Sequence, residues 1–230
     1  MTEHTSRHYE MELVELKEKI LFLGGTVEEM IGSAMRSLLD RDPELARQVI
    51  DSDPKVDSGE LEIDHLCLNL LALRQPAASD LRFIATALKI VTDLERIGDL
   101  AVNIAERSIE LNEEPPLKPY IDIPRMASAA AGMVRQSLDA FVKREPFLAR
   151  QVLRMDAAVD DLNVQLFREL LTYMIEEPKN VSRALRITFI AKYLERVADH
   201  ATNIAQMVIF MCEGRDVRHP GVQKRAGGES

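Results

Sequence analysis

A thirteen-residue segment occurs twice in this chain, and the duplication constrains the fold more than any other feature of the sequence. The first copy spans residues 94–106 (LERIGDLAVNIAE) and the second spans residues 194–206 (LERVADHATNIAQ). Eight of the thirteen positions are identical, and three of the others are conservative replacements. Similarity at a constant offset of this kind indicates that the chain consists of two related halves.

Each copy has the pattern of a helix with one apolar edge and one edge of side-chain oxygens. At about 100° per residue, the apolar side chains fall on one arc. In the first copy these are Leu94, Ile97, Gly98, Ala101, Ile104 and Ala105. The polar edge carries Glu95, Asp99, Asn103 and Glu106 in the first copy, and Glu195, Asp199, Asn203 and Gln206 in the second.

The rest of the chain also favours helices, and we predict an all-α fold. Alternating β-branched runs are scarce, and apolar positions recur with helical spacing. The predicted helices cover residues 9–39, 43–49, 54–73, 79–111, 124–143, 157–175 and 181–212, with a short helix after Glu145-Pro146. Asp42-Pro43 and Asp53-Pro54 each have the pattern of an N-cap followed by a first-turn proline. Gly24-Gly25 predicts either a kink or a close helix approach.

The duplication and a proline-rich segment divide the chain into parts. Residues 1–112 form the first repeat, residues 113–123 a linker, and residues 124–214 the second repeat. Prolines in the linker exclude a helix interior there. Residues 215–230 form a tail, which we expect to be disordered. The predicted architecture is two tandem three-helix bundles related by pseudo-twofold symmetry.

Charge and composition exclude several classes of protein. The net charge is −9, which disfavours nucleic acids and anionic membranes as partners. No apolar run is long enough for a membrane span, and the N-terminus lacks the apolar core of a signal peptide. Cys67 and Cys212 lack the spacing of a metal or redox motif. We therefore expect a cytoplasmic protein.

Antiparallel packing of the last two long helices in each half should bring carboxylates together. Counting outward from the turn at Gln75-Pro76 places Asp57 level with Glu95, and Asp53 level with Asp99. Counting from Pro178 places Asp160 near Glu195, and Asp156 near Asp199. All-oxygen clusters of this kind suit a hard cation, namely Mg²⁺, Mn²⁺, Ca²⁺ or iron.

Several simpler interpretations remain open for the same residues. The acidic edges could be solvated helix faces, with Arg96 and Arg196 forming ordinary surface ion pairs. Asp53 could serve only as an N-cap, and Asn103 and Asn203 could bond neighbouring carbonyl groups. His200 has the position of a surface residue rather than a ligand.

The duplicated ERIGDLAVNIAE and ERVADHATNIAQ motifs, with QPAASDLR at residues 75–82, resemble the PhoU family of regulators of bacterial phosphate uptake. The resemblance extends over residues 9–214. It implies two three-helix bundles, self-association into a homodimer, and metal ions at the acidic clusters (iron, manganese or magnesium, with Zn²⁺ or Ca²⁺ as possible substitutes in crystals). The metal-site residues that it implies are Asp53, Asp57, Glu95, Asp99 and Asn103 in the first half, and Asp156, Asp160, Glu195, Asp199 and Asn203 in the second.

The resemblance also implies a role. PhoU-like proteins link the ATPase subunit of the phosphate ABC transporter to a phosphate-sensing histidine kinase, and they restrain uptake and starvation signalling. Two departures set the halves apart: Leu100 replaces a histidine that is frequent in the family, and the second half lacks an Asp-Leu-Arg motif before its signature.

We therefore expect a metal-binding, non-enzymatic adaptor that regulates phosphate transport negatively. One alternative is a carboxylate-bridged metalloenzyme such as a di-iron oxidase, although histidines are missing from the clusters. The other alternative is a helical scaffold that binds no metal.

Overall fold

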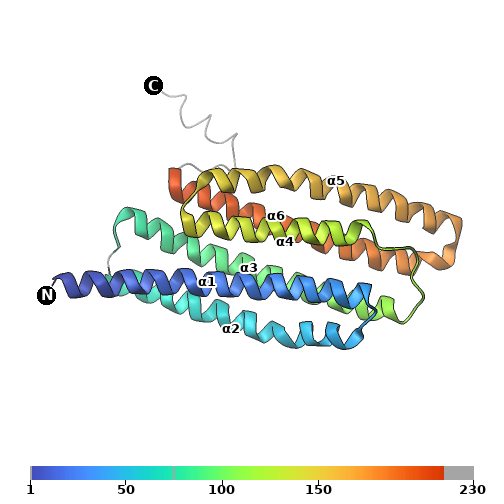
Figure 1. Cartoon of the computed structure of the whole chain (residues 1–230), viewed down its shortest axis with the longest axis horizontal. Helices are drawn as coiled ribbons and strands as arrows, with labels where there is room; N and C mark the ends of the chain where they lie inside the picture. The colour runs from blue at the N-terminus through green and yellow to red at the C-terminus, as the bar shows by residue number, and fades with distance from the viewer. Residues whose placement is uncertain (1, 75, 215–230) are drawn as a thin grey trace, which may run out of the picture.

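The computed structural model describes residues 2–74 and 76–214, and it is built from helices (Figure 1). The elements are α1 (Thr2–Leu39), α2 (Pro43–Arg74), α3 (Ala78–Asn112), α4 (Asp122–Lys143), α5 (Pro146–Glu176), a short 3₁₀ turn η1 (Pro178–Asn180) and α6 (Val181–Glu213). No strand occurs within these ranges, so the predicted all-α class is confirmed. The tail that we expected to be disordered lies outside the described residues.

The six helices form two three-helix bundles that lie side by side. Helices α1, α2 and α3 pack against one another in the first bundle, and α4, α5 and α6 do so in the second. Between the bundles, α3 packs along α6 and α1 packs against α4. Figure 1 shows the two bundles lying alongside each other. The buried apolar side chains of both bundles therefore belong to one continuous core.

Helices α2 and α5 are each continuous, which corrects the prediction of a short helix followed by a longer one. Pro54 lies inside α2, so Asp53 is not an N-cap. A proline within a helix removes one backbone hydrogen bond. The buried side chains of Val49, Val56 and Ile63 recur every seven residues across this point. Burial of this uninterrupted stripe stabilises α2 on both sides of Pro54, so the helix continues past the proline. The matching stripe of α5 consists of Val152, Val159 and Leu166.

Equivalent turns connect the first two helices of each bundle. Arg41 and Arg144, which are 103 residues apart, both adopt the left-handed conformation, with φ of 55° and 54°. The predicted N-cap at Asp42 is confirmed, because its Oδ1 accepts hydrogen bonds from the backbone N–H groups of Glu44 (2.9 Å) and Leu45 (3.1 Å).

The glycine pair in α1 marks a close approach between the two bundles, while the helix continues through both residues. A Cβ atom placed on Gly24 would lie 2.1 Å from Cδ1 of Leu138 in α4. Gly25 is exposed, and a Cβ atom there would meet nothing within 4 Å. Gly24 is therefore the residue that allows α1 and α4 to come together.

None of the helices in the described ranges combines the length and the apolar character needed to cross a membrane.

Candidate functional site

The signature helices α3 and α6 lie at the centre of the molecule, and each turns an acidic edge toward the neighbouring helix of its own bundle. Leu94, Ile97 and Ala101 of α3 are fully buried, which orients the edge that bears Glu95 and Asp99 toward α2. Gly98 lets α2 approach closely, since a Cβ atom at this position would lie 3.2 Å from Cγ1 of Val56.

In the first bundle, the carboxylates of Asp53, Asp57, Glu95 and Asp99 are close enough to influence one another. Burial raises the pKa of Asp53, and the negative charges of Asp57 and Asp99 raise it further. The pKa of Glu95 is raised by burial, by Asp99 and, more weakly, by Asp57, while Arg96 opposes the rise. The structure therefore brings together the four carboxylates that antiparallel counting had placed at equal heights.

Two further acids of α2, Glu60 and Asp64, extend this cluster and were missed in the sequence. Burial raises the pKa of Glu60, the Thr92 hydroxyl opposes this rise, and Asp64 and Asp57 add to it. The Oδ1 atom of Asp64 is buried and has no hydrogen-bond partner among the described residues. The spacing 57, 60 and 64 is a helical i, i+3, i+7 pattern, which could have revealed that these acids share a face.

The second bundle has its own cluster, formed by Asp156 and Asp160 of α5 and Glu195 and Asp199 of α6. The pKa of Asp156 is raised by burial and then by Asp160, Asp199 and Glu195. The pKa of Asp199 is raised by burial and by Glu195, while the charge of Lys192 opposes this. This arrangement corresponds to the first cluster under the pseudo-twofold relation.

The two clusters differ in their outer parts. At the offset of 103 residues, Asn163 replaces Glu60 and Phe167 replaces Asp64. The first cluster therefore gathers six carboxylates, and the second gathers four. This asymmetry lies in α2 and α5, outside the repeated signature segment.

Basic side chains partly compensate the acidic edges. Arg96 Nε lies 3.3 Å from Glu95 Oε2, and its Nη1 lies 3.6 Å from Asp99 Oδ2. Lys192 forms an ion pair with Glu195. The ion-pair alternative is thus realised at Arg96, although exposed pairs of this kind contribute little to stability.

The asparagines and the histidine of the signatures take different positions. Asn103 donates from Nδ2 to the carbonyl oxygen of Asp99 (2.7 Å), which leaves its Oδ1 available as an acceptor. Asn203 lines a surface depression with Lys89 and Asp93 of α3. His200 Nδ1 lies 2.7 Å from Asp93 Oδ1, so this residue joins the two bundles.

The donor atoms of both clusters fit a hard cation. The donors are oxygens, and Asp64 offers a buried oxygen that lacks a partner among the described residues. The pKa values of Asp53 and Asp156 are raised by burial and, after it, by the neighbouring carboxylates. In the described part of the chain, no three of the candidate acids and histidines stand in a ready-made ligand arrangement. A cation would therefore have to draw the side chains together.

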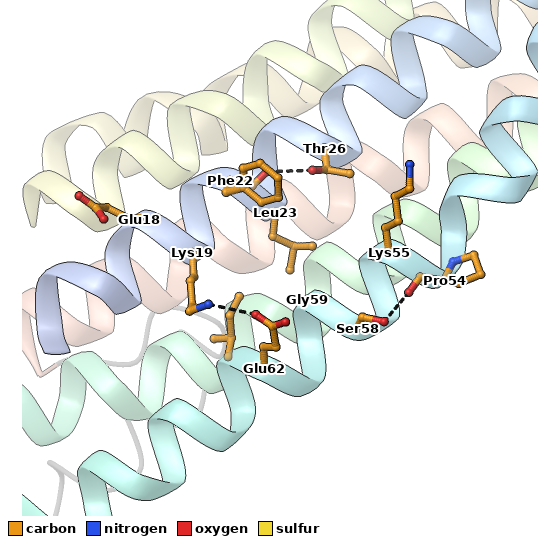
Figure 2. A pocket seen from close by; sticks show the side chains of 11 residues that line it. Glu18, Lys19, Phe22, Leu23, Thr26, Pro54, Lys55, Ser58, Gly59 and Glu62 are labelled. Carbon is orange, nitrogen blue, oxygen red and sulfur yellow. Dashed lines mark hydrogen bonds and ion pairs between the residues drawn. The ribbon is translucent and has the colours of Figure 1, made fainter.

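A separate groove lies between α1 and α2, on the outside of the first bundle (Figure 2). We call it the Phe22 groove. It has a volume of about 610 Å³ and an apolar floor made by Leu23 and Ile63. Phe22 stands at its edge with 78% of its surface exposed. No sequence pattern indicates this groove, because it depends on how two helices pack.

Comparison with protein families and solved structures gives consistent matches. The family model described as "PhoU domain" matches residues 20–108 and again residues 123–208. These two matches begin 103 residues apart, in agreement with the duplication.

Relatives and solved structures match over nearly the whole chain. Proteins named "Phosphate-specific transport system accessory protein PhoU homolog" from Pseudomonas aeruginosa and Aquifex aeolicus are 42% and 44% identical. The matches cover 97% of this chain and 93% of the Pseudomonas protein, and 93% of this chain and 97% of the Aquifex protein. The crystal structure of PhoU from Pseudomonas aeruginosa has a TM-score of 0.86 at 41% identity, covering 90% of this chain and 100% of that one. The phosphate transport system regulatory protein PhoU from Streptococcus pneumoniae has a TM-score of 0.84 at 28% identity, covering 91% and 99%.

Proposed function

Because the chain belongs to the PhoU domain family, we propose that it regulates phosphate transport as a cytoplasmic adaptor that carries out no catalysis itself. In this proposal it restrains phosphate uptake and phosphate-starvation signalling when phosphate is plentiful. Its partners are the ATPase subunit of the phosphate ABC transporter and a phosphate-sensing histidine kinase, and it acts as a homodimer. The relatives' printed name, an accessory protein of the phosphate-specific transport system, supports the association with transport.

The observation that carries the adaptor proposal is the pair of related acidic surfaces, one on each bundle. Pseudo-twofold duplication gives the molecule two surfaces with the same framework. These surfaces differ chemically, because the first bundle has Glu60 and Asp64 where the second has Asn163 and Phe167. Two related but distinguishable surfaces suit a protein that contacts two different partners.

We further propose that both surfaces hold a hard cation such as iron, Mn²⁺ or Mg²⁺. The ligands would be drawn from Asp53, Asp57, Glu95, Asp99 and Asn103 in the first bundle, and from Asp156, Asp160, Glu195, Asp199 and Asn203 in the second. A bound cation would offset both the burial and the repulsion that raise the pKa values of Asp53 and Asp156. The chain's own carboxylates would then fix the surface that a partner meets.

A transcriptional reporter for phosphate starvation, read at high phosphate, tests the regulatory role. Deleting the gene should leave the reporter active, and reintroducing the wild-type chain should restore repression. A chain with Glu95→Ala, Asp99→Ala, Glu195→Ala and Asp199→Ala should restore repression less well. Normal repression in the deletion strain, with no second copy of the gene present, would refute the proposal.

The control for this experiment removes carboxylates of α2 and α5 that lie outside the clusters. Asp51→Ala and Glu176→Ala change exposed acids that form no ion pair in the described part of the chain. This variant should repress like the wild type. The metal content of the purified proteins, measured in parallel, should fall in the cluster variant and stay unchanged in the control. Equal metal content in all three would favour the metal-free scaffold.

A further inference from the structure

We propose that the Phe22 groove is the surface through which two copies of this chain associate, with the Phe22 ring of each copy inserted beside Gly59 of the other. This inference deepens the homodimer proposed above by naming its interface. It is independent of the proposed regulatory role and of any bound metal.

The shape of this face suits the association of two copies. A phenylalanine side chain that is 78% exposed stands directly beside a groove of about 610 Å³ with a buried apolar floor (Figure 2). If a twofold axis passes between the Phe22 ring and the adjacent groove, the Phe22 ring of each copy enters the groove of the other copy. Such a self-complementary contact is what a twofold dimer requires.

In the other half of the same chain, the equivalent positions carry different side chains. The position equivalent to Phe22 is Arg125, and the position equivalent to Gly59 is Leu162. The second bundle thus forms the same three-helix fold with neither the protruding ring nor the glycine. The bundle fold as such does not require an exposed phenylalanine at this position, which favours a role in association for Phe22. Gly59 also serves packing within the chain, because a Cβ atom there would lie 3.0 Å from Leu23 Cδ1.

Charged side chains around the groove are placed so that two copies can complement each other. Lys19 Nζ pairs with Glu62 Oε2 at 3.0 Å across the groove. Glu18 and Lys55 lie on opposite sides of Phe22 in Figure 2, and neither has an ion-pair partner within the described ranges. A twofold axis near Phe22 exchanges these two sides, so that Glu18 of each copy faces Lys55 of the other. The four charged residues sum to zero, which limits repulsion between two chains of net charge −9.

Exposed apolar side chains continue along α1 beyond the groove. Met11, Val14 and Leu21 are 63%, 50% and 40% exposed, and they lie with Phe22 within an arc of about 100°. A stable interface buries roughly 800 Å² per partner, which a helix of 38 residues, about 57 Å long, can supply with its neighbour. Phe22 would be the central aromatic anchor of that interface.

Analytical ultracentrifugation of the full chain over a concentration series tests the proposal. The wild type should be a dimer, and Phe22→Arg should raise the dimer dissociation constant by at least about 30-fold, as expected for a central aromatic anchor. The matched control is Phe147→Arg, which changes a phenylalanine of α5 that is 65% exposed; it should leave the dimer unchanged.

Exchange of charges tests the orientation of the two copies. Glu18→Lys and Lys55→Glu should each weaken the dimer, and the double variant should recover most of the lost affinity. Circular dichroism should show the same helix content in all variants, since Phe22, Glu18 and Lys55 are exposed.

Three outcomes would overturn the inference. A wild-type chain that stays monomeric would remove both the homodimer and its interface. A wild-type dimer that survives Phe22→Arg would keep the homodimer and place its interface elsewhere. A dimer that is disrupted equally by Phe147→Arg would show that the effect is not specific to this groove. None of these results depends on the phosphate reporter, so the adaptor proposal is judged separately.

Discussion

Replacing Asp53 with alanine should stabilise the metal-free protein and destabilise the metal-loaded one. Asp53 lies inside α2, where aspartate is less favourable than alanine by roughly 0.6 kcal/mol. Its carboxylate also faces the negative charges of Asp57 and Asp99. Relief from each like-charged neighbour contributes about 0.3–0.5 kcal/mol at partly exposed positions. Asp53→Ala should therefore raise the free energy of unfolding by about 1.4 kcal/mol in the presence of a chelator.

Asp51→Ala provides the matched control for this change. Asp51 lies on the same helix but is exposed, so its replacement should show only the helix-propensity gain of roughly 0.6 kcal/mol. The difference between the two variants isolates the repulsion within the cluster. An N-cap role for Asp53 predicts the opposite sign, a loss of about 1 kcal/mol on substitution by alanine.

Thermal unfolding followed by far-UV circular dichroism measures the effect. For a chain of this size, the expected gain corresponds to an increase in melting temperature of roughly 3–6 °C with chelator present. With Mn²⁺ in excess, the order should reverse, because the variant has lost a ligand and binding to the folded state stabilises the wild type. The reasoning would be refuted if Asp53→Ala lowered the melting temperature in chelator, or if Asp53→Ala and Asp51→Ala gave the same gain.

Two further predictions concern the contacts of α1. Glu12 accepts hydrogen bonds from Arg74 Nε (2.9 Å) and Nη2 (2.8 Å), and this contact lowers the pKa of the Glu12 carboxyl. Glu12→Gln should therefore lower the melting temperature at neutral pH. The difference from the wild type should shrink as the pH falls below the ordinary glutamate pKa of about 4.3, and it should disappear below the lowered pKa of the folded state, where the carboxyl is protonated in both states. Gly25→Ala should stabilise the protein by about 1 kcal/mol through helix propensity. Gly24→Ala should lose that gain or become destabilising, because the Leu138 side chain has to move to make room for the added methyl group. Chemical denaturation of the two variants measures this difference.

Helical class, duplication and the pairing of the first four acids could be predicted because they depend on local or periodic properties. Apolar spacing determines which edge of α3 is buried, and the repeat at a constant offset establishes that α6 uses the same edge. Tight turns after α2 and α5 determine which residues stand at equal height on the two antiparallel helices. These rules alone place Asp53 and Asp57 on the same surface as Glu95 and Asp99.

Other features were decided by tertiary packing. Pro54 and the flanking Asp53 have the local pattern of a helix start, yet the buried stripe of Val49, Val56 and Ile63 holds α2 together across them. The contact of His200 with Asp93 and the close approach at Gly24 arise where the bundles meet, between residues far apart in the chain.

The two sites that distinguish the bundles also depend on this packing. Glu60 and Asp64 join the acidic cluster only because α3 covers that side of α2, and sequence periodicity does not specify which helix covers a given face. Phe22 and Gly59 form a ring and a groove only because α1 lies beside α2. The sequence by itself thus determined the helices and their repeat, whereas the tertiary structure decided which surfaces of the two related bundles became different, because side chains acquire neighbours only when the helices are packed.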